Sequence, residues 1–495
     1  MLYTITSTLP PKHGGRTKAL LSRIALIENE LNEYSTIVTT NYNANYPTVY
    51  DQFRKDGKAG SQLKFENLYD WLSGYQLFKI PTSRFLNKAI KVTTDRSMPG
   101  LKSVEKGDIV RYYDQDSYVL YRKYQPNTNI LEMEDFMSEV SRKKTERWEY
   151  NAYGELHRKI IYSPTHHGKL VEEFYDTAGS IYCRKFYSDE VKPNLILINL
   201  YRDGRMMKSF KKEKELFAYY FNHLFKDEDI VFVDARLLDR PILDVTADIK
   251  RVFVLHNSHL DGEELKPSYK SALLESEKIT RYLVLTQHQK EDILAQFDIP
   301  EEKMAVVPHF IQPESNPASV SIKDQFCFIG RFGLQKQMDH LLKSYALFKE
   351  SGHETKLVLY GMDEQGQLAM MVKLIDELGI RESVEIHSYT ENPSQVFRES
   401  KASLLTSEFE GFGLTVMESI NVGCPVISYD VKYGPREIIR HGENGYLVPA
   451  NDIEAFAQAM VHCVEHPLQD VQTQETLFKS TAVQNYDHLI KELKK

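Results

Sequence analysis

The chain has 495 residues, too many for a single hydrophobic core, and its charged and apolar fractions, 27% and 42%, exclude a disordered chain. The formal net charge of −8 excludes a general attraction to polyanions, so an acidic partner would have to meet local basic clusters. The four cysteines are dispersed, and neither a basic leader nor an apolar run of about 18 residues is present, so we expect a cytoplasmic protein that does not span a membrane.

The first residues predict the opening of a parallel, doubly wound α/β sheet. Leu2–Thr6 and Ser35–Thr40 have the character of short strands, and Lys18–Leu31, between them, has apolar residues at helical spacing. Ligands of such sheets bind beyond the carboxyl ends of the strands. Gly14 and Gly15, in the loop after the first strand, are therefore candidate ligand contacts, although a Gly-Gly pair is also a common turn.

Between Arg84 and Asn199 the sequence changes to short alternating runs that are rich in tyrosine and charge. Four of these runs predict antiparallel strands, namely Ile109–Asp114, Ser117–Tyr124, Arg158–Tyr162 and Ile181–Tyr187. Turn residues between the runs predict hairpins. We interpret this part of the chain as an inserted β-rich domain, which could bind a substrate, a partner or another copy of the chain, or be a plain insertion.

Alternating strands and helices return after the insertion. Val252–Leu255 predicts a strand that ends at His256, whose side chain could reach a ligand in the crevice or could merely end the strand. Prolines at both ends of Pro308–Pro313 predict an extended hinge. A second α/β unit follows, with predicted strands at Gln325–Ile329, Lys356–Tyr360, Val384–Ile386, Ala402–Leu405, Pro425–Tyr429 and Tyr446–Val448.

One loop of the second unit carries the densest set of candidate ligand contacts. Gly411 and Gly413 directly precede the predicted helix Leu414–Asn421, whose unpaired N–H groups and positive dipole end would face a ligand over the glycines. Glu410 lies in this loop and Glu418 about two turns into the helix. The two carboxylates could reach different hydroxyl groups of one elongated ligand, or they could simply favour a solvated helix start.

Two basic residues follow the first strand of the second unit. Arg331 comes at the end of that strand and Lys336 where the next helix begins, so together they could hold a diphosphate. Asp114 and Asp116 have the spacing of a metal-binding carboxylate pair, but a turn of the β-rich insertion explains them better. We therefore expect that no metal ion and no other cofactor is needed.

Taken together, these residues resemble the retaining GT-B glycosyltransferases that use nucleotide sugars. The residues that carry the resemblance are Gly14-Gly15, His256, Gly330-Arg331 with Lys336, the E-x7-E segment Glu410–Glu418, and the segments Gly434–Arg436 and Asn444–Leu447. The resemblance implies an α/β fold of the GT-B type, in which two Rossmann-like domains face a cleft and an antiparallel β-rich domain is inserted in the N-terminal half.

The domains expected on this basis divide the chain into five parts. Residues 1–83 and 200–312 would form the N-terminal, acceptor-side Rossmann-like domain, and residues 84–199 the inserted domain, used for oligomerisation or acceptor binding. Residues 313–478 would form the C-terminal nucleotide-sugar domain. Residues 479–495 would form a helix that packs back on the N-terminal domain.

The resemblance also implies roles for the candidate catalytic residues, which are His256, Arg331, Lys336 and Glu410. Arg331 and Lys336 would hold the diphosphate, Glu410 would hold the sugar, and His256 would contact the transferred sugar across the cleft. No residue is assigned as a nucleophile, because the resemblance favours front-face attack assisted by the departing phosphate over a carboxylate nucleophile.

Further residues would contact the rest of the donor. Glu418 would bind the ribose hydroxyls, and Gly14 and Gly15 would lie near the phosphate. The backbone at Tyr389 and Thr390 would read the uracil edge. The leaving group would be cradled by the amides of Gly413, Leu414 and Thr415.

Within this superfamily, the β-rich insertion and the run Tyr429–Pro435 resemble the wall teichoic acid α-glycosyltransferases, of the poly(glycerol-phosphate) α-glucosyltransferase type. This implies transfer of glucose from UDP-glucose to a polyanionic teichoic acid polymer at the inner face of a Gram-positive membrane. It also implies a homotrimer formed through the insertion, peripheral to the membrane at most, and no nucleic acid partner. Tyr360–Glu364 departs from the commoner G-x-G-x-E sequence, so Glu364 is not assigned a donor contact.

Because the chain is acidic, a polyanionic acceptor must be held by a local basic cluster. The predicted cluster consists of Arg202, Arg205, Lys208, Lys211 and Lys212. Three alternatives remain open: transfer of N-acetylglucosamine from UDP-GlcNAc to poly(ribitol-phosphate), a nucleotide-sugar epimerase on the same fold, and a non-catalytic protein that binds teichoic acid.

Overall fold

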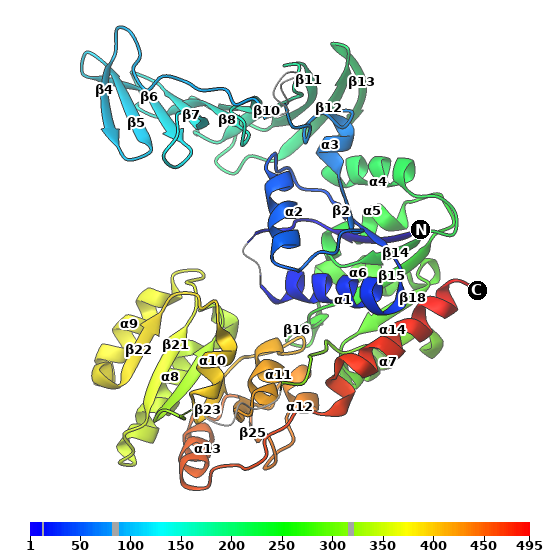
Figure 1. Ribbon diagram of the computed structural model, residues 1–495, viewed down its shortest axis with the longest axis vertical. Coiled ribbons are helices and arrows are strands. Elements are labelled where there is room, and N and C mark those ends of the chain that lie inside the picture. The colour runs from blue at the N-terminus through cyan, green and yellow to red at the C-terminus, as the bar shows by residue number, and fades with distance from the viewer. Residues whose placement is uncertain (12–13, 82–88, 315–320) are drawn as a thin grey trace. The chain divides into compact units, whose positions relative to one another are not determined.

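The computed structural model describes residues 1–11, 14–81, 89–314 and 321–495, and the chain divides into two compact units (Figure 1). Unit 1 comprises Met1–His13 and Tyr34–Ile249, and unit 2 comprises Gly14–Glu33 and Lys250–Lys495. The predicted boundary between residues 83 and 84 lies outside the described residues.

Unit 1 contains four parallel strands in the order β14 (Ile230–Val233), β1 (Leu2–Thr6), β2 (Ser35–Thr39) and β3 (Lys64–Asn67). Every residue of β1 and of β14 is buried, which explains why these strands are short, almost continuous apolar runs. The helices of unit 1 are α2 (Tyr46–Lys55), α3 (Leu68–Leu72), α4 (Glu213–Leu224), the short 3-10 helix η1 (Arg236–Leu238) and α5 (Asp239–Leu243).

The rest of unit 1 is a ten-stranded antiparallel sheet in which every strand pairs with its neighbours along the chain. Its strands are β4 (Lys102–Lys106), β5 (Ile109–Asp114), β6 (Ser117–Tyr124), β7 (Leu131–Met137), β8 (Lys144–Tyr150), β9 (Leu156–Tyr162), β10 (Lys169–Tyr175), β11 (Ile181–Tyr187), β12 (Leu195–Arg202) and β13 (Arg205–Phe210). The predicted antiparallel insertion is therefore confirmed in type.

The sheet continues beyond Asn199, where the prediction ended the insertion, as far as Phe210. Asp203 and Gly204 both have positive φ, 50° and 71°, and form the two-residue turn that joins β12 to β13. The strand after this turn was missed because Arg205–Phe210 lacks a regular alternation of apolar and polar residues.

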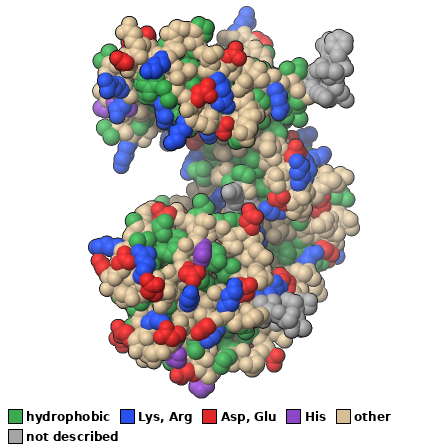
Figure 2. Space-filling view, turned by 60° about the vertical axis from the view of Figure 1, so that its left-hand side comes forward, with side chains coloured by type: hydrophobic (Ala, Val, Ile, Leu, Met, Phe, Trp, Pro, Cys, Tyr) green, Lys and Arg blue, Asp and Glu red, His purple; other side chains and the backbone are tan. Residues whose placement is uncertain are grey.

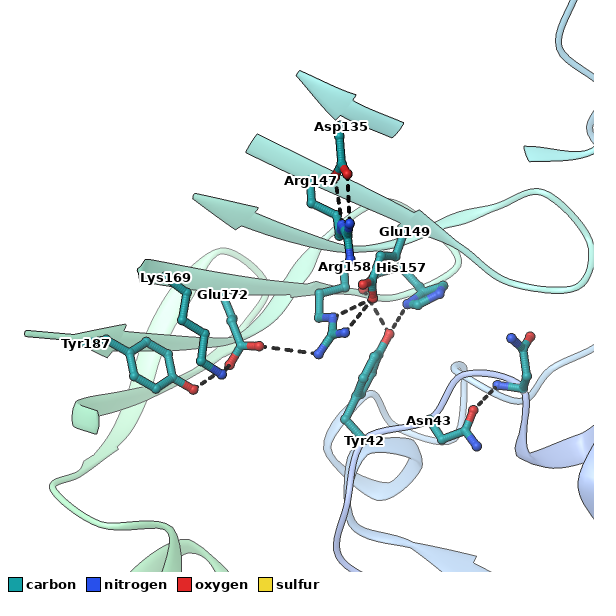
Figure 3. A network of polar contacts seen from close by, with 11 residues as sticks. Tyr42, Asn43, Asp135, Arg147, Glu149, His157, Arg158, Lys169, Glu172 and Tyr187 are labelled. Carbon is teal, nitrogen blue, oxygen red and sulfur yellow. Dashed lines mark hydrogen bonds and ion pairs between the residues drawn. The ribbon is translucent and has the colours of Figure 1, made fainter. Parts of the chain in front are cut away.

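Ion pairs between neighbouring strands connect the middle of this sheet (Figure 3). Arg147 of β8 donates two hydrogen bonds of 2.7 Å to Asp135 of β7, and Arg158 of β9 contacts Glu149 of β8 and Glu172 of β10. The first two of these pairs join residues directly opposite each other, so side-chain charge reinforces the register of the strands.

Tyr42 attaches the sheet to the loop after β2. Its ring contacts those of Tyr69 and Phe174 at centroid distances of 5.1 and 4.8 Å, and its hydroxyl meets Nδ1 of His157 (Figure 3). Burial, reinforced by the nearby charge of Arg158, lowers the pKa of His157 to about 3, so this histidine is neutral near pH 7.

Unit 2 contains two groups of parallel strands. The first has the order β15 (Lys250–Leu255), β18 (Arg281–Val284) and β19 (Met304–Val306). The second is a six-stranded sheet with the order β22 (Val384–His387), β21 (Lys356–Tyr360), β20 (Gln325–Ile329), β23 (Ala402–Leu405), β24 (Val426–Tyr429) and β25 (Gly445–Val448). The predicted second α/β unit is thus present, strand by strand.

Helices accompany both groups of strands in unit 2. They are α1 (Gly15–Leu31), α6 (Lys270–Leu274), α7 (Gln287–Gln296), α8 (Met338–Glu350), α9 (Gln367–Glu377), α10 (Pro393–Arg398), α11 (Leu414–Asn421), α12 (Gly434–Ile438), α13 (Ile453–Glu465) and α14 (Lys479–Leu493). A small hairpin, β16 (Leu260–Asp261) and β17 (Glu264–Leu265), follows β15, and short 3-10 helices lie at Pro267–Tyr269, Ser276–Lys278, Glu301–Lys303, Leu334–Lys336, Arg381–Ser383 and Glu475–Leu477.

The C-terminal helix α14 packs against α1, where an ion pair joins Lys479 to Glu30. Across the described ranges, no helix combines the length and the apolar character that a membrane span requires.

Candidate active site

The strand order of the six-stranded sheet creates a place for a ligand. From β20 the chain continues outward through β21 and β22 on one side, and then returns to build β23, β24 and β25 on the other. The loops after β20 and β23 therefore leave neighbouring strands in opposite directions at the carboxyl edge, which is the switch point where ligands of such sheets bind. Arg331 and Lys336 lie in the first loop and Glu410 lies in the second.

Hydrogen bonds to backbone carbonyls connect these two loops. The N–H of Glu408 donates to the carbonyl of Gln335 over 2.9 Å, and the hydroxyl of Thr406 donates to the carbonyl of Lys336 over 3.0 Å. The position of Lys336 relative to Glu410 is therefore fixed by the backbone as well as by the side chains.

Lys336 and Glu410 form an ion pair at the switch point. Nζ of Lys336 lies 2.5 Å from Oε1 of Glu410, and the two side chains are only 16% and 10% exposed. The hydroxyl of Ser407 donates to the same carboxylate oxygen over 2.7 Å. The pair places a cation and a hydrogen-bond acceptor side by side in a part-buried site, as an anionic ligand that also carries hydroxyl groups requires.

Arg331 is paired differently. Its Nη1 lies 2.6 Å from Oε1 of Glu364, in the loop after β21, and the two side chains are 64% and 41% exposed. A Cβ added to Gly333 would lie 2.5 Å from the other oxygen of Glu364, so this glycine leaves room for the carboxylate. Because exposed pairs contribute little free energy, Arg331 can exchange Glu364 for a phosphate at low energetic cost.

The start of α11 provides backbone donors beside these side chains. Gly413 caps the helix with φ 90° and ψ 60°, a left-handed conformation that favours glycine. A Cβ on Gly15, the first residue of α1, would lie 2.8 Å from Cδ1 of Leu414. The N-terminal ends of α1 and α11 therefore meet, and the predicted contacts Gly14, Gly15, Gly413, Leu414 and Thr415 lie together.

Glu418, in the second turn of α11, forms an ion pair with Lys18 of α1. Lys18 was placed in a helix by the sequence but was not assigned to the site. Nothing in the local sequence of either helix could have revealed the pair, because its members are 400 residues apart.

His256 lies at the end of β15 and meets the loop after β23 from the other side. A Cβ on Gly411 would lie 2.2 Å from the carbonyl oxygen of His256, so only glycine allows this approach. The ring of the half-buried His256 stacks with that of His309 at 5.8 Å. The carbonyl of Asn257 accepts hydrogen bonds from Tyr269 and Gln289, each over 2.9 Å, which fixes the loop that carries His256.

The segment after β24 forms backbone hydrogen bonds with the loop that carries Glu410. The N–H of Glu410 donates to the carbonyl of Lys432, and the N–H of Tyr433 donates to the carbonyl of Glu410. A Cβ on Gly434 would lie only 1.6 Å from the carbonyl oxygen of Phe412. Glycine at position 434 is therefore a packing requirement of the site.

Tyr389 and Thr390 lie in the loop after β22, two strands away from β20 along the same edge. Tyr389 is 63% exposed, and the hydroxyl of Thr390 accepts the N–H of Asn392 over 3.2 Å. The strand order thus places Tyr389 and Thr390 on the same carboxyl edge of the sheet as Glu364, Arg331 and Glu410. They lie at the end of this edge formed by β22.

The predicted acceptor cluster lies in unit 1, whereas all the other candidate residues belong to unit 2. The cluster is on and just after the β12–β13 hairpin, and its members, Arg202, Arg205, Lys208, Lys211 and Lys212, are all exposed. Acidic and basic side chains are interspersed over the face shown in Figure 2. The hairpin and the residues just after it are rich in lysine and arginine.

Asp114 is the last residue of β5, and Gln115, with φ 51°, and Asp116 form the turn to β6, as expected. In the described part of the chain, no group of three or more His, Cys, Asp or Glu side chains is arranged to hold a metal ion.

Comparison with known proteins agrees with this architecture. Residues 314–476 match the family of glycosyl transferases group 1. The chain is 25% identical to the poly(glycerol-phosphate) alpha-glucosyltransferase of Bacillus subtilis (strain 168), over 96% of this chain and 72% of that protein. It is also 25% identical to the poly(ribitol-phosphate) alpha-N-acetylglucosaminyltransferase of Staphylococcus aureus (strain COL), over 94% and 92%.

Among solved structures, the chain is similar to a mutant of S. aureus TarM in complex with Fondaparinux, alpha-GlcNAc-glycerol and UDP. The TM-score is 0.78 at 22% identity, and the match covers 99% of this chain and 98% of that one. The predicted GT-B fold and the predicted resemblance to wall teichoic acid α-glycosyltransferases are confirmed. The chain is a glycosyltransferase of the hexosyltransferase class, and neither the epimerase nor the non-catalytic alternative is favoured.

Proposed function

We propose that this glycosyltransferase moves glucose from UDP-glucose to the glycerol-phosphate units of a wall teichoic acid, with retention of the anomeric configuration. The observation that carries the proposal is the contact between Lys336 and Glu410, 2.5 Å at the switch point and next to the start of α11. It offers one ligand a cation, a hydroxyl acceptor and backbone N–H donors, which a sugar attached to a diphosphate needs together. The named relatives supply the substrate class.

The chemistry follows from the bond that breaks. As the anomeric C–O bond lengthens, negative charge grows on the diphosphate and positive charge on the sugar ring. Lys336, Arg331 and the amides of Gly413 to Thr415 would stabilise the diphosphate, and Glu410 and His256 would hold the sugar. In our proposal the departing phosphate takes the proton of the acceptor hydroxyl on the same face of the ring, so no carboxylate acts as nucleophile.

Two protein cations would take the place that a divalent metal ion has in other transferases. Lys336 and Arg331 would each direct a positively charged group at the diphosphate, and we propose that turnover needs no metal. Equal rates of transfer with and without EDTA would support this part of the proposal, and a rate restored only by added Mg²⁺ or Mn²⁺ would refute it.

The polymer would be bound in unit 1, by the exposed basic hairpin that carries Arg202, Arg205 and Lys208. Several weak contacts to successive phosphates would add along the chain of the acceptor. We place the enzyme in the cytoplasm of a Gram-positive bacterium, peripheral at the inner face of the membrane.

The ten-stranded sheet would also assemble the protein into a homotrimer. Both edge strands, β4 and β13, are almost wholly exposed, and exposed edges invite pairing. One row of directly opposite residues is mainly apolar yet half-buried or exposed, and consists of Phe136, Glu146, Ile161, Val171, Phe186 and Leu197. A closed symmetric assembly would cover such a surface.

The direct test is a matrix of donors and acceptors. UDP-glucose and UDP-GlcNAc are each incubated with poly(glycerol-phosphate) and with poly(ribitol-phosphate), and transfer is followed by released UDP and by the mass of the polymer. We expect the highest kcat/KM for UDP-glucose with poly(glycerol-phosphate). Preference for UDP-GlcNAc would refute UDP-glucose as the donor, and preference for the ribitol polymer would refute poly(glycerol-phosphate) as the acceptor. Release of UDP without modified polymer would overturn the acceptor assignment.

A further inference from the structure

Helix α1 contributes a charged side chain to the candidate donor site. Nζ of Lys18 contacts Oε1 of Glu418, whose side chain is 16% exposed. The same two helices touch at their first residues, Gly15 and Leu414. Two separate contacts therefore fix α1 against α11 on the side where Glu418 lies.

The space around this ion pair is small. A cavity of about 80 Å³ is lined by residues of α1, α11 and α14, among them Lys18, Ser22, Leu414, Glu418 and Tyr486. The ion pair with Lys18 holds one oxygen of the Glu418 carboxylate and thereby restricts the orientation of the other.

We propose that Lys18 is a positioning residue for the nucleotide donor: it holds Oε1 of Glu418, so that the other carboxylate oxygen is aimed at the ribose hydroxyls. The inference rests on the proposed function, in which Glu418 binds the ribose. It adds a residue from the N-terminal part of the chain to a donor site whose other charged members all come from residues 256–418.

Packing alone does not explain the lysine. Its side chain is 55% exposed, so it fills no core position. It lies in the first turn of α1, where the helix dipole disfavours a positive charge. A carboxylate next to the lysine offsets that effect, and Glu418 provides one.

The test measures binding of UDP by calorimetry, separately from turnover. Lys18→Met should weaken UDP about tenfold, the size expected when a charge-assisted contact no longer orients its partner, while Lys18→Arg should retain most of the affinity. At saturating donor, kcat should change less than about twofold, because Lys18 does not touch the reacting atoms. Lys491→Met, which removes an exposed lysine–aspartate pair with Asp487 within α14, is the control and should bind UDP as the wild type does.

The ribose itself provides the second readout. Wild-type protein should prefer UDP over 2′-deoxy-UDP, and both Lys18→Met and Glu418→Gln should reduce this preference. In the double variant the two effects should not add, because both act on one contact. Melting temperatures within about 2 °C of wild type would show that α1 remains in place.

Three results would overturn the inference. One is unchanged UDP affinity in Lys18→Met. Another is an equal loss of affinity for UDP and 2′-deoxy-UDP, which would mean that Lys18 acts on the phosphates or on the fold. The third is additivity with Glu418→Gln. If the wild type does not bind UDP, the donor assignment of the proposed function is refuted. This failure is distinguishable from failure of the inference about Lys18, because it is seen before any variant is measured.

Discussion

Lys336 and Glu410 come from the loops after β20 and β23 and meet with Nζ 2.5 Å from Oε1, both side chains mostly withdrawn from solvent. Ser407 donates a hydrogen bond to the same oxygen. A ligand that binds here does not find an isolated cation. It finds an ion pair, so in the proposed function the sugar hydroxyls would engage Glu410 while the diphosphate engages Lys336.

Replacement of Lys336 should affect both turnover and stability. Lys336→Ala removes a charge that the leaving group needs, which should lower kcat by roughly 10² to 10³. It also leaves the part-buried Glu410 without its cation, which should lower the free energy of unfolding by about 1 to 3 kcal/mol. Steady-state kinetics with UDP-glucose and urea unfolding measure the two effects.

Arg331→Ala is the matched comparison. It removes a second charge from the diphosphate and should also reduce kcat strongly, yet its partner Glu364 is well solvated, so the free energy of unfolding should change by less than about 0.5 kcal/mol. Near-normal turnover in either folded variant would refute the assignment of that residue.

Gly434→Ala should be strongly destabilising. The new methyl group would lie 1.6 Å from the backbone oxygen of Phe412, which is not a flexible side-chain end, so the loop that carries Glu410 must move. We expect a loss of about 3 kcal/mol or more in the free energy of unfolding. Gly14→Ala, at a position with open space within 4 Å and an ordinary φ of −88°, is the stability control. Equal stability of the two variants would show that Gly434 is not tightly packed.

Asp239 should make the stability of unit 1 depend on pH. Its side chain is 2% exposed, and its Oδ2 lies 3.4 Å from Nη1 of Arg236. Among the described residues, neither carboxylate oxygen has a hydrogen-bond partner, and burial raises the pKa of Asp239 to about 7 against the opposing charges of Arg236 and Lys214. The folded state therefore binds this proton more tightly than the unfolded state, whose pKa is about 3.9. This contribution to stability is complete below pH 4, falls as the pH rises toward 7, and is lost above 7.

The measurement is the difference between the free energies of unfolding at pH 5 and at pH 8. Asp239→Asn should reduce that difference by about 2 to 3 kcal/mol. Asp244→Asn, which removes an exposed carboxylate paired with Arg240, should leave it unchanged. A wild-type difference that survives in Asp239→Asn would assign the pH dependence to another group.

Acceptor binding should depend on polymer length and on salt. Alanine at Lys208, Lys211 and Lys212 should raise the KM for long poly(glycerol-phosphate) by several-fold and flatten its salt dependence, because contacts to successive phosphates are lost. Alanine at Lys102 and Lys106, on the opposite edge strand of the same sheet, is the control. Transfer to a single glycerol-phosphate unit that matches transfer to the polymer, without sensitivity to salt, would exclude this mode of binding.

The sheet should also determine the oligomeric state. Light scattering at micromolar concentration should give the mass of a trimer for the wild type. Ile161→Asp, in the middle of the apolar row, should shift the protein toward monomer, because a buried unpaired charge opposes association. Val140→Asp, at a 96%-exposed residue in the turn between β7 and β8, should not change the oligomeric state. A monomeric wild type would refute assembly through the sheet.

Much of the fold could be predicted because many of its strands are recognisable from their local sequence. β1, β14 and β23 are buried throughout and are short, mainly apolar runs, and the loops after β1 and β23 hold candidate residues. β13 could not be predicted in the same way, since an edge strand with exposed faces needs no apolar alternation. Its existence depends on the turn at Asp203 and Gly204.

The candidate site was predictable only in part, for a related reason. Gly411, Gly413, Glu410 and Glu418 lie within one short segment, so their proximity follows from local structure. The partners of the charged residues do not: Lys18 is 400 residues from Glu418, and Glu364 reaches Arg331 only because β21 lies next to β20. Contacts between residues far apart in the chain depend on the order of the strands in the folded sheet, and this order cannot be read from a single sequence.

The ten-stranded sheet has one more consequence, for the time at which the chain folds during synthesis. Every strand from β4 to β13 pairs with strands adjacent to it in sequence, so the whole sheet forms from local contacts within residues 102–210. Contacts of short sequence separation form early, and N-terminal parts of a chain fold while later parts are still being made. The sheet can therefore be complete on the ribosome before any residue of the six-stranded sheet has been synthesised.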